Sequence, residues 1–143
     1  MQDVRDAGGE LSAVAALLSR WCDAADRRDP AALCALFAAP GNLVFGDKPH
    51  HGLAEIGAAF TARMPAGRVT RHLWTNPRLT AVEHGRLRCE STQLTLERDA
   101  QGVQTRLRVS DVSDVLRRDE HGGWRIESRA IVRVMSLLAD TDD

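Results

Sequence analysis

The chain has 143 residues, of which 43% are hydrophobic and 27% charged, a size and balance typical of one compact domain that can bury a full core. Nineteen lysines and arginines against 20 aspartates and glutamates give a net charge of -1, so the sequence argues against nucleic acid and anionic membranes as partners. Three cysteines, Cys22, Cys34 and Cys89, at uneven spacing favour neither a disulfide framework nor a zinc site.

The N-terminus lacks the basic start and apolar run of a signal peptide, and no stretch approaches membrane-spanning length. We therefore expect a cytoplasmic protein that does not bind membranes. Residues 1–8 end at a Gly-Gly pair and residues 138–143 are acidic, so both segments are predicted to be flexible ends of a single domain spanning residues 1–143.

The first half of the chain carries helical signals. Apolar residues recur every three or four positions over residues 10–25, which predicts a helix with one buried stripe. An Asp-Pro start predicts a second helix over residues 30–38, followed by a short strand at 42–45 and a polar, mobile loop at 46–52. Helical spacing returns over residues 56–64, which predicts a third helix.

The second half reads as strands. Residues 69–83, 86–98, 103–118 and 124–137 are rich in Val, Leu, Ile and Thr and are separated by short turns, so they predict an antiparallel sheet that curls around the helices. Within residues 103–109, apolar and polar side chains alternate, which predicts one buried and one wet face. The fold class is therefore α+β.

This order of elements, together with several local motifs, resembles the SnoaL-like domains of the nuclear-transport-factor-2-like superfamily. The motifs are Ala24-Ala25-Asp26-Arg27-Arg28-Asp29, Ala35-Leu36-Phe37, Gly52-x-x-x-Ile56, Arg71-His72-Leu73-Trp74-Thr75-Asn76, and Asp114-Val115-Leu116-Arg117-Arg118 with Gly123-Trp124-Arg125-Ile126. The resemblance covers residues 10–136. It implies a cone-shaped fold in which three N-terminal helices pack on a curved, mainly antiparallel sheet that encloses a pocket.

Two segments are similar to the stretches that carry the Asp–His dyad of hexachlorocyclohexane dehydrochlorinase, namely residues 25–28 and 72–79. Scytalone dehydratase pairs an aspartate of its first helix with a histidine of the same strand. Carried over by position, the resemblance implies that Asp26 and His72 form a catalytic dyad.

The comparison with these enzymes gives one further matching residue and two differences. A functional arginine on the last strand of the dehydrochlorinase corresponds to Arg129. The catalytic lysine of the dehydrochlorinase corresponds to Trp21, and the second histidine of scytalone dehydratase has no counterpart in residues 89–91. Neither enzyme's substrate is therefore carried over to this chain.

Physical reasoning leaves two interpretations for each member of the dyad. Asp26 lies at the edge of the apolar stripe and is not needed as a helix cap. It is therefore either a functional-site residue or the partner of a surface arginine such as Arg27 or Arg28. His72 shares a strand face with Trp74, and its imidazole is either a proton acceptor oriented by a carboxylate or a packed side chain.

The last strand leaves the direction of Arg129 open. Simple alternation puts Arg129 on the wet face with Arg125, and a β-bulge would be needed to turn it inward. Asp114 is either a site residue or a structural partner of Arg125. Cys89, on a candidate pocket strand, is either a packing residue or a nucleophile.

We predict that an apolar or aromatic-like small molecule binds in the pocket. The candidate contacts are Trp21, Phe37, Phe45, Phe60, Met64, Trp74, Asn76 and Cys89. Adjacent His50 and His51 lack a third ligand at a recognisable spacing, so no metal is predicted. Phosphate-binding loops and nucleophile elbows are absent from the sequence, and no cofactor is predicted.

Two functions fit these residues. The first is a cofactor-independent lyase or isomerase in which His72, with Asp26 and Arg129, carries out dehydration, elimination or isomerisation. The second is a non-catalytic ligand-binding or assembly module of the same fold. A cavity of about 300 Å³ or more opening onto His72 would favour chemistry or small-molecule binding, and a filled interior would favour the module. A homodimer through the sheet is expected, with a trimer as the alternative.

Overall fold

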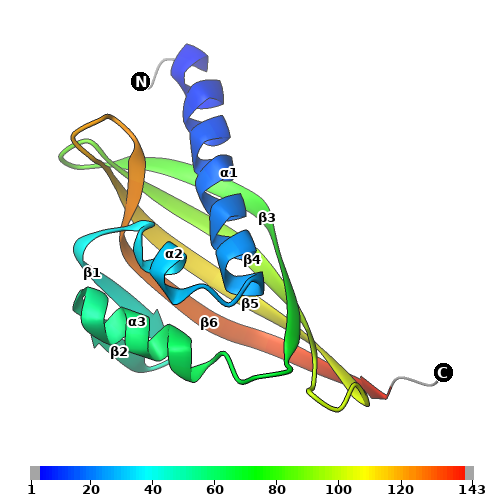
Figure 1. Ribbon diagram of the computed structural model, residues 1–143. Helices are drawn as coiled ribbons and strands as arrows, with labels where there is room; N and C mark the ends of the chain where they lie inside the picture. The colour runs from blue at the N-terminus through cyan, green and yellow to red at the C-terminus, as the bar shows by residue number, and fades with distance from the viewer. Residues whose placement is uncertain (1–3, 141–143) are drawn as a thin grey trace.

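Three helices lie against one face of a curved six-stranded sheet in the computed structural model, which describes residues 4–140 and the side chains of residues 9–139 (Figure 1). The helices are α1 (Val4–Asp26), α2 (Pro30–Cys34) and α3 (Gly52–Ala62). The strands are β1 (Phe37–Phe45), β2 (Lys48–His51), β3 (Val69–Val82), β4 (Arg86–Arg98), β5 (Gln104–Arg118) and β6 (Trp124–Asp140). The predicted α+β fold is confirmed.

The strand order is β2-β1-β6-β5-β4-β3. β1 runs parallel to β6, and every other neighbouring pair is antiparallel. Four strands that follow one another in sequence thus form most of the sheet, as the short turns between them predict. Because β2 and β3 are the two edges, the sheet stays open, and the helices cover its concave side (Figure 1).

The core lies between the apolar stripe of α1 and this sheet. On α1 the buried side chains recur at helical spacing and are Val14, Leu17, Leu18, Trp21, Cys22 and Ala24. They pack with Leu33, Phe37, Leu43, Ile56 and Phe60 of the following elements and with Leu87, Cys89, Leu116 and Ile126 of the sheet. Full burial of one such leucine stabilises the fold by about 1.5–3 kcal/mol, so the stripe as a whole anchors α1 on the sheet.

The second helix is shorter than predicted, and the strand after it is longer. α2 ends at Cys34 instead of near Ala38, and β1 already begins at Phe37. The reason is tertiary: the backbone N–H of Ile126 donates to the carbonyl of Leu36 at 2.9 Å, so β6 captures the chain before the helix can continue. Local signals contain no information about this partner.

The predicted loop at residues 46–52 is wrong for residues 48–51, which form the edge strand β2. α3 then begins at Gly52, four residues before the helical spacing of residues 56–64, and ends at Ala62. Its early start is explained by Glu55, whose carboxylate accepts the backbone N–H of His51 at 2.8 Å and so satisfies a donor just before the helix.

The two predicted flexible ends contain regular structure where they are described. The helix α1 begins at Val4, and the strand β6 runs to Asp140. Residues 1–3 and 141–143 lie outside the described residues. No helix in the described part of the chain is long and apolar enough to cross a membrane.

The two faces of β5 differ from the prediction near its N-terminal end. Leu107 and Val109 are only half-buried, and the alternate positions Arg108 and Ser110 line the interior cavity. Leu107 and Val109 therefore face away from the helices at this end of the sheet. The predicted alternation is present, but the predicted buried face is wrong, because this end of β5 extends beyond the apolar core.

Candidate active site

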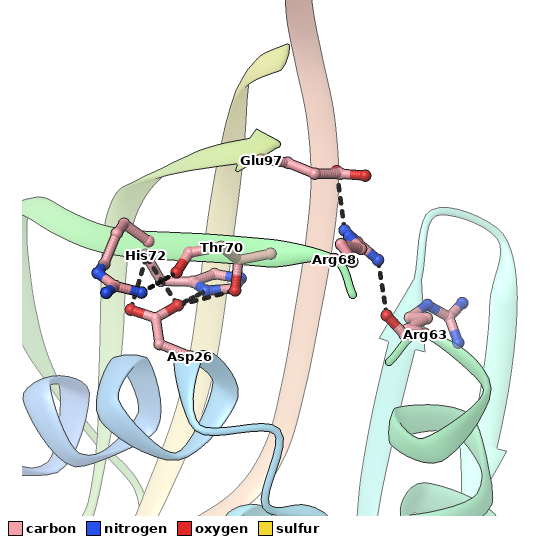
Figure 2. Close-up of polar contacts among 7 residues, drawn as sticks. Asp26, Arg63, Arg68, Thr70, His72 and Glu97 are labelled. Carbon is pink, nitrogen blue, oxygen red and sulfur yellow. Dashed lines mark hydrogen bonds and ion pairs between the residues drawn. The ribbon is translucent and has the colours of Figure 1, made fainter. Parts of the chain in front are cut away.

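Asp26 and His72 are in direct contact. Asp26 is the last residue of α1, and β3 passes this end of the helix and carries His72 (Figure 2). Nδ1 of His72 lies 2.6 Å from Oδ1 of Asp26, and the two side chains are 18% and 16% exposed. Within the described residues Asp26 makes no ion pair with Arg27 or Arg28. The predicted contact is therefore present, and its catalytic use remains a prediction.

Further hydrogen bonds fix the carboxylate of Asp26. The hydroxyl of Thr70 donates to Oδ1 at 3.0 Å, and the backbone N–H of His72 lies 3.1 Å from each carboxylate oxygen. An ionised carboxylate can only accept hydrogen bonds, so Nδ1 of His72 must carry a hydrogen. In the neutral ring, Nε2 then has the free lone pair.

The surroundings favour the neutral form of His72. Burial lowers the pKa of His72 below its ordinary value of 6.5, because the protonated ring would lose its hydration. The hydrogen bond and charge of Asp26 oppose this change, whereas the positive charges of Arg68 and Arg129 lower the pKa further. Since the net direction is downward, the ring is ready to accept a proton at neutral pH.

His72 lines a cavity of about 170 Å³ that lies between the helices and the sheet and opens to solvent. Its walls come from all three helical regions and from five strands. The lining residues are Trp21, Ala25, Arg28, Leu33, Phe45, Phe60, Arg63, Met64, Arg68, Thr70, His72, Gln93, Thr95, Arg108, Ser110, Ile131 and Arg133. The volume is below the 300 Å³ expected to favour chemistry, yet the interior is not filled.

Four of the predicted contact residues line this cavity together with His72. They are Trp21, Phe45, Phe60 and Met64. The ring of Phe60 packs edge-on against those of Trp21 and Phe45, with centroids 5.3 Å and 6.2 Å apart. These rings give the cavity an apolar floor of fixed shape.

The other four predicted contact residues are not part of the lining. Phe37 is buried in the core, and the indole N–H of Trp74 donates to the hydroxyl of Ser19 at 3.1 Å. Asn76 is exposed at an irregularity of β3 with a positive φ of 53°. Cys89 is fully buried, and this burial raises the pKa of its thiol to about 11. The thiol is therefore protonated at neutral pH and poorly suited to nucleophilic attack.

The last strand contains the β-bulge that an inward Arg129 requires. Ser128 and Ile126 pair with successive residues of β5, so Glu127 is the extra residue. The two faces of β6 exchange at this point, which turns Arg129 into the interior, where it is 3% exposed.

Arg129 forms a buried ion pair beneath the cavity floor. Its Nε lies 2.9 Å from Oδ1 of Asp114, and its Nη2 donates to Oδ2 at 3.3 Å. The guanidinium carbon lies 3.8 Å from the centre of the Trp21 ring. Burial raises the pKa of Asp114, and the positive charge of Arg129 opposes this. Arg125 pairs with Asp119 instead, so the suggested Asp114–Arg125 pair is wrong.

Sequence reasoning missed a group of arginines that line the cavity, which are Arg28, Arg63, Arg68, Arg108 and Arg133. They come from the turn after α1, the segment between α3 and β3, and the strands β5 and β6. Figure 2 shows the guanidinium of Arg68 between the carboxylate of Glu97 and the backbone of Arg63. The sequence signal for the two strand arginines, Arg108 and Arg133, is the alternation of polar and apolar residues, which by itself indicates a solvated face.

The two adjacent histidines lie on and beside the edge of the sheet. Nδ1 of His51 lies 2.6 Å from the side-chain oxygen of Asn42, and the ring of His50 packs edge-on against Phe45. Among the described residues, no group of three or more His, Cys, Asp or Glu side chains could hold a metal ion.

Three solved structures illustrate how widely this fold recurs. ActVI-ORFA from Streptomyces coelicolor is 23% identical, with a TM-score of 0.80 over 87% of this chain and 97% of its own. A scytalone dehydratase-like protein from Novosphingobium aromaticivorans is 17% identical, with a TM-score of 0.81 over 94% and 89%. A type 2 hexachlorocyclohexane dehydrochlorinase is 17% identical, with a TM-score of 0.77 over 98% and 94%. At these identities the likeness concerns the fold.

The family of this chain is identified from its amino-acid sequence. No curated protein matches the chain. The model of the SnoaL-like domain matches residues 10–130, which include both members of the dyad, α2, α3 and most of α1. The chain therefore belongs to the SnoaL-like domain family.

Proposed function

We propose that the protein is a cofactor-independent enzyme in which His72, held by Asp26, abstracts a proton from a small molecule in the cavity. The observation that carries this proposal is the 2.6 Å contact between Nδ1 of His72 and Asp26, which leaves Nε2 as the basic nitrogen of a ring that lines the cavity. A general base of this kind accelerates proton transfer by about 10²–10⁴-fold.

The chemical step follows from the tautomer. Nε2 takes a proton from a C–H or O–H group of the substrate, so that an N–H bond forms and the electron pair of the broken bond stays on the substrate. The imidazolium is stabilised by the carboxylate of Asp26. The proton is then returned to a departing hydroxyl group, which gives dehydration, or to another carbon, which gives isomerisation. Departure of a halide ion from the substrate completes an elimination instead, and the imidazolium of His72 then gives its proton to solvent.

Two neighbours in fold support this class of reaction. A scytalone dehydratase-like protein and a hexachlorocyclohexane dehydrochlorinase share the same architecture. The two names describe loss of water and loss of hydrogen chloride from a larger molecule. We propose chemistry of the same type here, on an apolar or ring-containing substrate that packs against Trp21 and Phe60.

Arg129 supports the reaction indirectly in this proposal. Its guanidinium stacks under Trp21 and its charge helps to keep His72 neutral, but it is not among the residues that line the cavity. We therefore assign it a positioning role, in which Arg129, held by its buried pair with Asp114, fixes the position of the Trp21 ring that lines the cavity.

A second candidate is a ligand-binding or assembly module in which the Asp–His pair only stiffens the pocket. The observation that favours it is the volume of about 170 Å³, which is smaller than the pockets that usually enclose drug-sized ligands. The two candidates differ in one measurable respect, because a binding module would not exchange protons with its ligand.

Hydrogen–deuterium exchange separates these candidates without knowledge of the complete reaction. Ring ketones, hydroxylated ring ketones and halogenated rings that raise the unfolding temperature are incubated with the protein in D₂O. Proton NMR then follows loss of the acidic C–H signal. We expect exchange with the wild-type protein and none above background with His72→Gln. Equal exchange with both proteins would reject His72 as the base.

A further inference from the structure

The cavity has an excess of positive charge that the proposed proton transfer does not use. Five arginines line it, and they belong to four separate parts of the fold, so no single helix or turn explains their convergence. Like charges gathered in a partly closed space repel one another unless a counter-charge is present. The protein supplies little counter-charge of its own.

Glu97 is the carboxylate that contacts two of these arginines. Nη2 of Arg68 lies 2.8 Å from its Oε2, and Nη1 of Arg108 contacts the same oxygen. All three side chains are largely buried. The Nε groups of Arg68 and Arg108 are buried and have no hydrogen-bond partner among the described residues. The single negative charge of Glu97 therefore does not neutralise both guanidinium groups, and the Nε–H donors of Arg68 and Arg108 are left without acceptors.

The other three arginines have no carboxylate partner within 4.0 Å in the part of the chain that the structure describes. Backbone carbonyls hold two of them: Arg28 donates to Pro65 at 3.1 Å, and Arg63 donates to Ala59 at 3.0 Å. The guanidinium of Arg63 also stacks on the ring of Phe45 at 3.7 Å. Arg63 is therefore held in place at the cavity while its charge remains unpaired.

We propose that the substrate carries a carboxylate or an equivalent anionic group, which binds these arginines while its ring lies on the aromatic floor of the same cavity. This proposal rests on the proposed function, because it names the substrate class of the same site. A cavity of about 170 Å³ accommodates about one ring, since an apolar cavity of about 150 Å³ holds benzene. Guanidinium groups bind carboxylates through paired N–H donors, which fixes the orientation of the ring relative to His72.

The test compares ligands that differ only in charge. Isothermal titration calorimetry at low salt measures the binding of benzoate, benzamide, 4-methylbenzoate and 4-methylbenzamide to the full chain. Hydrogen bonds to a charged group are stronger than those to a neutral one, so we expect each carboxylate to bind at least about tenfold more tightly than its amide. Inorganic phosphate alone should bind more weakly than either carboxylate, because it has no ring.

Variants of two unpaired arginines locate the anion. In Arg63→Gln/Arg133→Gln the preference for carboxylate over amide should fall to less than about threefold, and the single variant Arg133→Gln, at an exposed position, should show an intermediate preference. The matched control is Arg88→Gln on the outer side of β4, which should keep the wild-type preference. Equal binding of acid and amide, no binding of either acid at millimolar concentration, or an unchanged preference in the double variant would overturn the proposal.

Binding and turnover separate this proposal from the proposed function. His72→Ala removes the proposed base but none of the arginines, so it should still prefer benzoate over benzamide. Loss of turnover with this preference retained supports both proposals. Exchange activity on neutral ligands without any carboxylate preference would sustain the base and reject the anionic substrate.

Discussion

Nδ1 of His72 and Oδ1 of Asp26 lie 2.6 Å apart although the two residues are separated by 46 positions in the sequence. The end of α1 and the first part of β3 supply them, and Thr70 braces the carboxylate from the same strand. This arrangement sets the tautomer of His72.

The substitution Asp26→Asn should lower kcat by about 10²–10⁴-fold and leave KM nearly unchanged. The asparagine keeps the shape but can offer an N–H to the ring, which favours the tautomer whose Nε2 is already protonated. Steady-state kinetics on a compound found by the exchange screen measures the effect. Thr70→Val, which removes one bracing hydrogen bond, serves as the milder control. A kcat within threefold of wild type in Asp26→Asn would contradict the orienting role.

The pH dependence of kcat/KM should rise through one group with a midpoint below 6.5. Burial and nearby arginines lower the pKa of His72, so the ring becomes neutral, and therefore active, at a lower pH than an exposed histidine. NMR titration of the His72 ring checks the same value directly. In Asp26→Asn the midpoint should fall further, because the aspartate raises the pKa. A midpoint above 6.5 in the wild-type protein would be inconsistent with this electrostatic account.

Breaking the buried Arg129–Asp114 pair should destabilise the fold strongly. Arg129→Met leaves Asp114 as an uncompensated charge with no exposed surface, so we expect a loss of about 3–5 kcal/mol in the free energy of unfolding. Asp114→Leu/Arg129→Met should regain most of it. Urea unfolding followed by circular dichroism measures both.

The exposed pair between Arg27 and Asp23 provides the control for the buried pair, since Arg27→Gln should cost less than about 1 kcal/mol. If the double variant were as unstable as Arg129→Met, then lost packing instead of the unpaired charge would be the cause.

The outer face of the sheet carries exposed apolar side chains, and we therefore predict that the protein self-associates. Leu73, Leu94, Val109 and Met135 pair across four neighbouring strands and form one apolar row, at whose ends Leu73 is 49% and Met135 60% exposed. A row of this kind on a free face favours a partner. Light scattering should give twice the mass of 15.7 kDa, or three times if the assembly is a trimer.

Met135→Lys, in this apolar row, should convert the assembly to monomers, whereas Leu53→Lys on α3 should not. A wild-type mass near 15.7 kDa at micromolar concentration would exclude this association.

Much of the fold could be predicted because it is encoded locally. The stripe from Val14 to Cys22 and the turns between the four long strands each act within a short stretch of chain. The Asp26–His72 contact came from a family resemblance and could not be derived from spacing alone. It depends on where β3 passes the end of α1.

The parts that could not be predicted depend on tertiary context. α2 stops at Cys34 because β6 binds the following chain, and Arg129 turns inward because Glu127 bulges. The charged character of the cavity was missed for a related reason. Arg108 lies on a face that alternation marks as wet, and only the curvature of the sheet makes that face the wall of a cavity.

The turnover of His72→Ala tests the central claim most directly. The variant is compared with wild type in kcat, in the affinity for the same compound by calorimetry, and in the midpoint of thermal unfolding. We predict that kcat falls by at least about 10²-fold while affinity and unfolding midpoint stay close to the wild-type values. Full turnover in His72→Ala, with the ligand bound as in wild type, would contradict the assignment of His72 as the general base.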